Sequence, residues 1–130
     1  MATEGTPNEG LEYASALVYG SQLSLVCYTN AADSLGPTSV YADLVQPATA
    51  NGYAPIALDG DWTFTDGTVS YLKDAANPRW TATGSWSVTV TGVAMVDIAD
   101  GTLLHFRDNA IPFIAANLKK LEVDIVTLVA

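Results

Sequence analysis

The sequence predicts a mainly β fold, an antiparallel β-sandwich or jelly-roll-like domain that carries one short N-terminal helix. The clearest observation is the segment from Trp80 to Thr91, where apolar or small side chains at even positions alternate with Ser or Thr at odd positions. Strand side chains alternate between faces, so this segment predicts one apolar face and one row of six uncharged hydroxyls. The second observation is a series of short apolar runs separated by turn residues, which is typical of antiparallel folds.

The chain length predicts a single domain. It has 130 residues, of which 49% are apolar, enough to bury a sizeable core. Residues 1–10 are polar and contain Gly5, Pro7 and Gly10, so we expect an N-terminal arm there. Residues 11–130 form the β-rich domain.

The first half of the chain predicts few regular elements. Apolar residues at helical spacing indicate a short helix over residues 10–20, and the apolar run 23–28 indicates a strand. Residues 29–37 are rich in turn formers and predict a loop. Residues 40–45 fit either a strand or one helical turn, and 46–52 predict a second loop.

From Ile56 onward the pattern is strand and turn. Asp59-Gly60 and Asp66-Gly67 mark turns on either side of a strand at 62–65, and residues 68–72 continue as another strand. A loop is expected at 74–78.

The C-terminal part predicts longer strands. Twelve residues from Trp80 to Thr91 exceed the usual strand length, so we expect Gly84 to bend or bulge that strand. Asp100-Gly101 separates the runs 93–98 and 102–107 and is the best hairpin signal in the chain. A last strand is expected over 120–129.

Charge excludes several partners. Fourteen acids against five bases give a net charge of −9, and residues 1–72 contain eight acids and no Lys or Arg. Nucleic acids and anionic membranes both require a basic patch, so we expect neither as a partner. No stretch reaches the length of a membrane span and no signal peptide is visible. Charged residues are only 15% of the chain, which indicates a surface that is easily desolvated against other proteins or other copies.

Candidate catalytic and metal-binding residues are sparse, and we expect no catalytic, cofactor or metal site. His105 is the single histidine and lies in an expected strand, where a hydrogen-bonded structural role is favoured over catalysis. Cys27 is interpreted as a small buried hydrophobe. Asp59, Asp61 and Asp66 could supply oxygen ligands to calcium, but the spacing departs from the calcium-loop pattern and turn formation explains two of them.

The aromatic residues allow two interpretations. Tryptophans and tyrosines could form a sugar-stacking platform, or they could fill the core. Trp80 and Trp86 share their face with Ala82, Val88 and Val90, and this favours the core for both.

Several segments together resemble the small β-rich virion structural proteins of tailed bacteriophages, of the capsid decoration (cement) or fibre type. The segments are Leu23 to Asn30, Asn51-Gly52-Tyr53-Ala54, Trp62-Thr63, Val93 to Val96, Asp100-Gly101, Leu103 to Phe106, Pro112 and Leu121 to Ile125. The resemblance implies a non-enzymatic protein made in the bacterial cytoplasm and placed on the capsid exterior. It implies the major capsid protein and the chain's own copies as partners.

The resulting hypothesis is a decoration protein that bridges shell subunits by adhesion alone, as a homotrimer and without cofactors. The contact residues we expect are Glu4, Asn8 and Glu9 in the arm, with Tyr41 and Leu44 in the ambiguous segment. Three alternatives stay open: a carbohydrate- or receptor-binding module of a fibre or tail, a tail or connector structural protein, and a small hydrolase built around His105.

Overall fold

The computed structural model describes residues 9–10, 23–29, 35–58, 62–65, 68–71 and 78–123. Almost all regular structure in these ranges is β, which confirms the expectation of a mainly β fold. A single 3-10 turn, η1 (Tyr41–Asp43), follows the first long strand, and residues 9–10 are helical. The rest of the helix expected over residues 10–20 lies outside the described residues.

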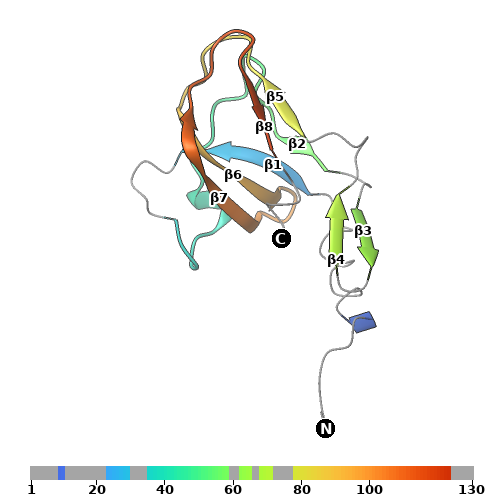
Figure 1. The fold of residues 1–130 in the computed structure, drawn as a ribbon. Coiled ribbons are helices and arrows are strands. Elements are labelled where there is room, and N and C mark those ends of the chain that lie inside the picture. Colours follow the sequence, from blue (N-terminus) through green and yellow to red (C-terminus); the bar gives the residue numbers. More distant parts are fainter. Residues whose placement is uncertain are drawn as a thin grey trace.

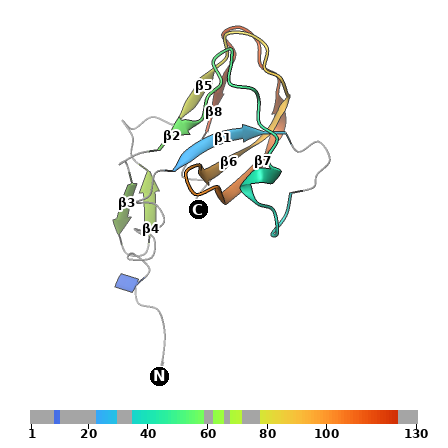
Figure 2. The same cartoon turned by 180° about the vertical axis from the view of Figure 1, so that it is seen from behind.

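The described strands pair in an antiparallel manner (Figures 1 and 2). The main sheet has four strands in the order β2-β1-β6-β7, and two further pairs are β3-β4 and β5-β8. Their bounds are β1 Ser24–Tyr28, β2 Ile56–Ala57, β3 Trp62–Thr65, β4 Thr68–Tyr71, β5 Arg79–Thr81, β6 Val90–Asp97, β7 Thr102–Phe113 and β8 Lys120–Glu122.

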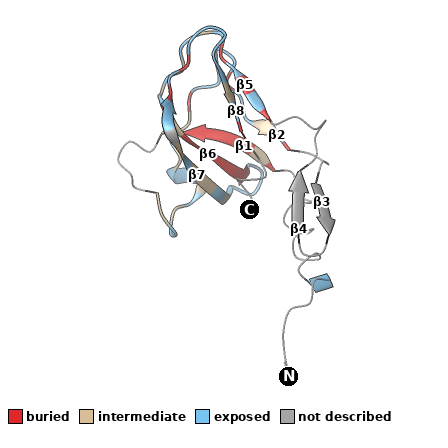
Figure 3. Ribbon diagram, viewed as in Figure 1, coloured by how far each residue is buried: buried red, intermediate tan, exposed pale blue. Residues whose placement is uncertain are grey.

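The central strands β1 and β6 are buried on both faces (Figure 3). In their register Leu25 lies opposite Met95, and Cys27 lies opposite Val93. Directly opposed residues in an antiparallel pair share a face, so these four side chains point to one side of the sheet. The expected strand over 23–28 is therefore confirmed, and Cys27 is buried as expected.

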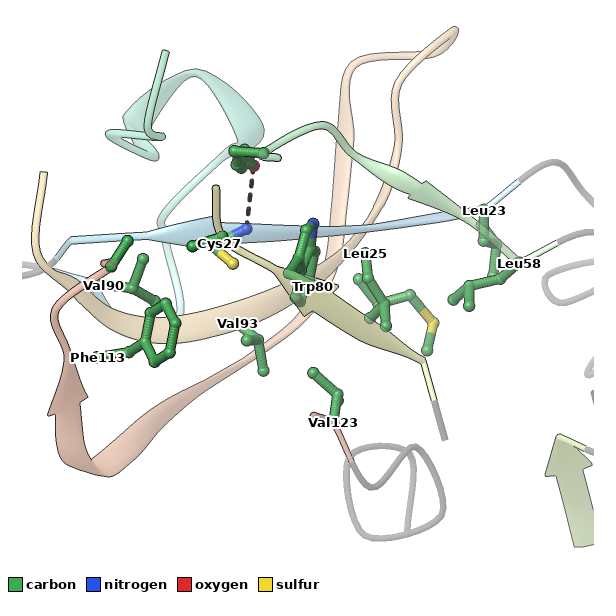
Figure 4. Packing of buried hydrophobic residues seen from close by; sticks show 13 residues of the cluster. Leu23, Leu25, Cys27, Leu58, Trp80, Val90, Val93, Phe113 and Val123 are labelled. Atoms are coloured by element: carbon green, nitrogen blue, oxygen red, sulfur yellow. Dashed lines mark hydrogen bonds between the residues drawn. The ribbon is translucent and has the colours of Figure 1, made fainter. Parts of the chain in front are cut away.

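The first face of the main sheet carries the larger core cluster (Figure 4). Side chains from β1 and β6 meet Trp80 of β5, Phe113 at the end of β7, and Val123 just after β8. The β5-β8 pair thus supplies part of the cover for this face. The buried members are Leu23, Leu25, Cys27, Tyr53, Leu58, Trp80, Ala82, Val90, Val93, Met95, Phe113, Ala115 and Val123.

The second face carries a smaller cluster made of Val26, Tyr28, Ala94 and Val96. It is covered by partly buried side chains of the η1 region and of β7, namely Leu35, Tyr41, Leu44, Leu103 and Phe106. Residues 40–45, left open between strand and helical turn, form η1 and then a single bridge from Val45 to Thr29.

A tyrosine on the second face explains a glycine in the central strand. The Tyr28 hydroxyl donates a hydrogen bond of 2.7 Å to Asp108 Oδ1 on β7. To reach β7 the ring crosses Gly92 of β6, where a Cβ atom would collide with the ring and would lie 2.7 Å from the Arg107 carbonyl oxygen. Glycine therefore permits a contact that ties the edge strand β7 to β1 across β6.

The hairpin predicted at Asp100-Gly101 is confirmed. Gly101 has a φ of +70°, and the Asp97 carboxylate accepts the Asp100 N–H at 3.1 Å. The second strand of the hairpin, β7, is longer than expected because it continues to Phe113. Two irregularities interrupt its pairing with β6, an extra residue at Leu104 and an expanded stretch over 109–112.

The expectation of one twelve-residue strand from Trp80 to Thr91 is wrong. The chain forms β5, leaves regular pairing over 82–89, and enters β6 at Val90. The alternation of faces nevertheless persists, with even positions buried or partly buried and odd positions from Thr81 to Thr89 exposed. The bend expected near Gly84 is present, and it is broad because β5 and β6 pair with different strands, β8 and β1.

The remaining expectations are met in part. The strands predicted at 62–65 and 68–72 correspond to β3 and β4, whose register joins Thr65 to Thr68. The last strand is present as β8, and residues 124–130 of its expected range lie outside the described residues. Most of the expected loop at 74–78 also lies outside them.

Candidate interaction surface

Three segments that are distant in sequence converge at one end of the molecule. They are residues 46–53, residues 82–89 and residues 114–120, and together we call them the apical surface. In both views the segment joining β5 to β6 and the segment joining β7 to β8 arch over this end, while η1 lies toward the other end (Figures 1 and 2).

Asn51 links the first two segments. Its carbonyl oxygen accepts the Thr83 N–H at 2.9 Å and the Trp86 indole N–H at 2.9 Å, and its Nδ2 donates to the Ser85 carbonyl oxygen at 2.7 Å. Asn51 has a φ of +52°, a left-handed conformation that asparagine tolerates better than most residues. Asn51 therefore suits this turn in two ways: it tolerates the positive φ, and its side-chain amide makes a hydrogen bond.

The third segment is linked to the second by main-chain hydrogen bonds. The Ala82 N–H donates to the Lys119 carbonyl oxygen at 2.8 Å, and the Leu118 N–H donates to the Ala82 carbonyl oxygen at 2.7 Å. Leu118 itself has a φ of +66°, and its side chain is 72% exposed. The geometry holds a large apolar side chain out in solvent.

Four aromatic rings lie beneath the apical surface. Tyr53 stacks on Trp80 with ring centroids 6.1 Å apart and meets Trp86 edge-on at 5.2 Å, and Trp86 contacts Phe113 at 5.4 Å. Trp80 is buried and its indole donates to the Ala54 carbonyl oxygen, while Trp86 is partly buried and packs on the core. The interpretation of both tryptophans as core residues is confirmed for Trp80 and holds in part for Trp86.

The exterior of the apical surface is polar without being acidic. Thr83, Ser85, Ser87 and Thr89 are exposed, as the hydroxyl row predicted. Ile114, in the third segment, is 63% exposed. The only charged residues in the three segments are Lys119 and Lys120, so this end carries +2 in a chain of net charge −9. The Lys119 ammonium lies 5.2 Å from the centre of the Phe113 ring.

Burial keeps the Tyr53 hydroxyl and the Cys27 thiol, which lie beneath this surface, in their protonated forms. The Tyr53 hydroxyl accepts the Cys27 N–H at 3.1 Å and donates to Gln46 Oε1 at 3.0 Å. Burial raises the pKa of Tyr53 and the pKa of the Cys27 thiol well above their usual ranges. Cys27 is therefore held as a neutral thiol, in which form it is a poor nucleophile.

A separate cleft of about 390 Å³ lies between β7 and the loop before η1. His105, Ser39 and Pro37 are among the residues that line it. His105 lies in a strand as expected, within β7 opposite Met95, and it is exposed. The Ser39 hydroxyl accepts the Gly36 N–H at 2.8 Å, so it is engaged in the local turn.

The predicted contact residues fall in different places. Glu4 and Asn8 lie outside the described residues, and Glu9 is exposed. Tyr41 and Leu44 are partly buried against the second core cluster, so much of their surface is used within the chain. Their neighbours Val40 and Val45 are the exposed ones, at 54% and 53%. The sequence pattern left this segment ambiguous, and only the helical turn shows which side chains point outward.

The possible calcium ligands Asp59, Asp61 and Asp66 also lie outside the described residues. Within the described ranges, no group of three or more His, Cys, Asp or Glu side chains is placed to hold a metal ion. In the same ranges no helix combines the length and the apolar character needed to cross a bilayer.

Comparison of the chain with protein-family models, with curated proteins and with solved structures finds no match.

Proposed function

We propose that this chain is a capsid decoration protein of a tailed bacteriophage, a non-enzymatic component that coats the head and bridges shell subunits. In this proposal it is made in the host cytoplasm, binds the major capsid protein, and acts as a homotrimer without cofactors. Its finer fold is a β-sandwich or jelly-roll-like arrangement, for which the β5-β8 pair covering one face of the main sheet is the supporting feature.

The apical surface is the observation that carries this proposal. It is cross-linked by hydrogen bonds through Asn51 and Ala82, so it presents a fixed shape rather than a mobile loop. Ile114 and Leu118 are exposed apolar side chains, and the three apical segments contain no Glu or Asp, two residue types that are depleted at the centres of protein interfaces. Pre-ordered groups of low desolvation cost favour adhesion, because less conformational entropy is lost on contact.

The charge distribution also fits a head exterior. A protein of net charge −9 is repelled by packaged DNA, so it does not compete with the genome for the shell. A layer of such proteins stabilises the assembled head by mass action, since it binds the assembled state and not the separated subunits.

The test is binding to empty heads that lack the protein, from a tailed phage whose genome encodes this chain. We expect saturable co-sedimentation with a fixed number of copies per shell subunit, and an increase in the temperature at which the heads rupture. An excess of the chain that leaves both sedimentation and rupture temperature unchanged would contradict the proposal.

A tryptophan fluorescence titration with sugars separates the glycan-binding alternative. Trp80 is buried, and Trp86 is partly buried and contacts the rings of Tyr53 and Phe113, so among the described residues the tryptophan rings are largely used within the chain. We therefore expect no quenching by sugars. Quenching that saturates with sugar would instead favour a receptor-binding module.

A further inference from the structure

The apical surface stands out as a positively charged end on an acidic protein. Lys119 and Lys120 are exposed, and the three apical segments contain no carboxylate. The rest of the chain therefore carries −11 to reach the total of −9. The apical surface of one copy and the rest of a second copy therefore carry net charges of opposite sign.

A complementary patch lies at the η1 region. Val40 and Val45 are both more than half exposed, and Asp43 between them is exposed and is the only charged residue in the segment 35–45. One Asp43 carboxylate oxygen accepts the Val40 N–H at 2.8 Å, which fixes the carboxylate at the start of the turn. We call Val40, Asp43 and Val45 the η1 patch.

The two patches match in kind. The apical surface has two exposed apolar side chains, Ile114 and Leu118, together with two lysines, and the η1 patch has two exposed valines together with one aspartate. They lie toward opposite ends of the molecule (Figures 1 and 2). One copy can therefore use both patches at once, with a different neighbour at each.

We infer that the apical surface of one copy binds the η1 patch of the next, in a head-to-tail contact between copies of this chain. Such a contact joins two different surfaces, so it repeats and produces an assembly larger than a dimer. Apolar burial supplies attraction, and the opposed charges select this pairing over apical-to-apical contact, where four lysines would meet. The inference rests on the proposed function, in which copies adhere to one another in the decoration layer.

Substitution with rescue tests the contact. We expect the wild-type chain to sediment as a species larger than a dimer. Ile114→Glu and Val45→Lys each replace an apolar side chain of the contact with a charged one that is costly to desolvate, so each variant should weaken self-association at least tenfold. In the double variant the introduced acid and the introduced base lie on opposite sides of the contact and can pair, so it should recover most of the association.

A matched control is Ile98→Glu, because Ile98 is an exposed isoleucine in the β6-β7 turn and belongs to neither patch. It should leave the sedimentation coefficient unchanged. Thermal unfolding followed by circular dichroism should show that all variants are folded. A wild-type chain that stays monomeric or stops at a dimer overturns the inference, and so does a double variant as dissociated as the single ones.

Binding to empty heads separates this inference from the proposed function. If the wild-type chain binds heads but does not self-associate in this way, the head-to-tail contact is wrong and the decoration role stands. If the chain self-associates with charge rescue but ignores heads, the contact stands and the decoration role is wrong.

Discussion

The body of the molecule and its apical surface are held together by different forces. In the body, β1 and β6 are buried on both faces and their side chains fill two apolar clusters. At the apical surface, the segments are joined by hydrogen bonds through Asn51 and Ala82, and much of the exterior is exposed. The difference indicates that folding free energy comes mainly from the body, whereas the apical surface is the part that contacts another molecule under the proposed function.

The aromatic group made of Tyr53, Trp80, Trp86 and Phe113 lies at the boundary between the two regions. Its rings pack on the first core cluster, and the indole N–H of Trp86 donates a hydrogen bond to the Asn51 carbonyl oxygen. Removing a buried ring, crowding the body, breaking the Asn51 turn and truncating an exposed apical side chain should therefore have progressively smaller effects on the free energy of unfolding.

The largest effect is expected from Trp80→Ala. Trp80 is buried, stacks on Tyr53 and donates its indole N–H to Ala54, so the substitution leaves a cavity and an unpaired carbonyl. We expect the free energy of unfolding to fall by about 3–5 kcal/mol, measured by urea denaturation. A loss below about 1 kcal/mol would mean that the first cluster does not dominate stability.

The next effect is expected from Gly92→Ala in the body. The added Cβ collides with the Tyr28 ring, which cannot shift without disturbing its hydrogen bond to Asp108, and lies 2.7 Å from the Arg107 carbonyl oxygen. We expect a loss of about 1–3 kcal/mol in urea denaturation. Gly36→Ala is the matched control, because nothing lies within 4 Å of its Cβ position, and it should be close to neutral.

The body was the more predictable of the two regions. The strand at 23–28 and the hairpin at Asp100-Gly101 depend on short apolar runs and on turn residues that are adjacent in sequence. The alternation from Trp80 to Thr91 also predicted which side chains are exposed. It did not predict the break after Thr81, because that break depends on β5 pairing with β8, some 40 residues away.

The apical surface could not be predicted because it depends on contacts between distant segments. Asn51-Gly52 is predicted as a turn from its sequence, but nothing local places it against Thr83 and Ser85. The need for glycine at position 92 could not be predicted either, because it arises from the Tyr28 ring, which crosses Gly92 to reach Asp108. For η1, the sequence led us to expect Tyr41 and Leu44 as contact residues, whereas the turn geometry buries both in part and exposes Val40 and Val45.

Alkaline pH should act on the body through three buried groups. Burial raises the pKa of Cys27, Tyr53 and Tyr28 above ordinary values near 9 and 10, and the Asp108 carboxylate raises that of Tyr28 further. The folded state thus holds protons that the unfolded state releases, so the free energy of unfolding should be constant below pH 9 and fall above it. Each group contributes a slope of up to about 1.4 kcal/mol per pH unit.

The measurement is the urea midpoint between pH 7 and pH 11. Tyr53→Phe removes one titrating group and should make the alkaline decline shallower. A decline that is equally steep in this variant would show that the Tyr53 hydroxyl is not protected by the core.

At the boundary, Asn51→Ala should cost about 1 kcal/mol, since it removes a hydrogen bond to Ser85 and places alanine at a positive φ. Asn51→Gly separates the two causes, because glycine accepts the φ but also lacks the amide. If glycine restores most of the loss, backbone conformation is the main contribution. If it does not, the side-chain hydrogen bond is.

The smallest effect on folding is expected from Ile114→Ser at the apical surface. Ile114 is 63% exposed, so its truncation removes little buried area and should change the free energy of unfolding by less than about 0.5 kcal/mol. The same substitution should weaken self-association measured by analytical ultracentrifugation, whereas Ile98→Ser should not. A large loss of stability with unchanged association would reverse the division of roles between the two regions, because Ile114 would then belong to the body.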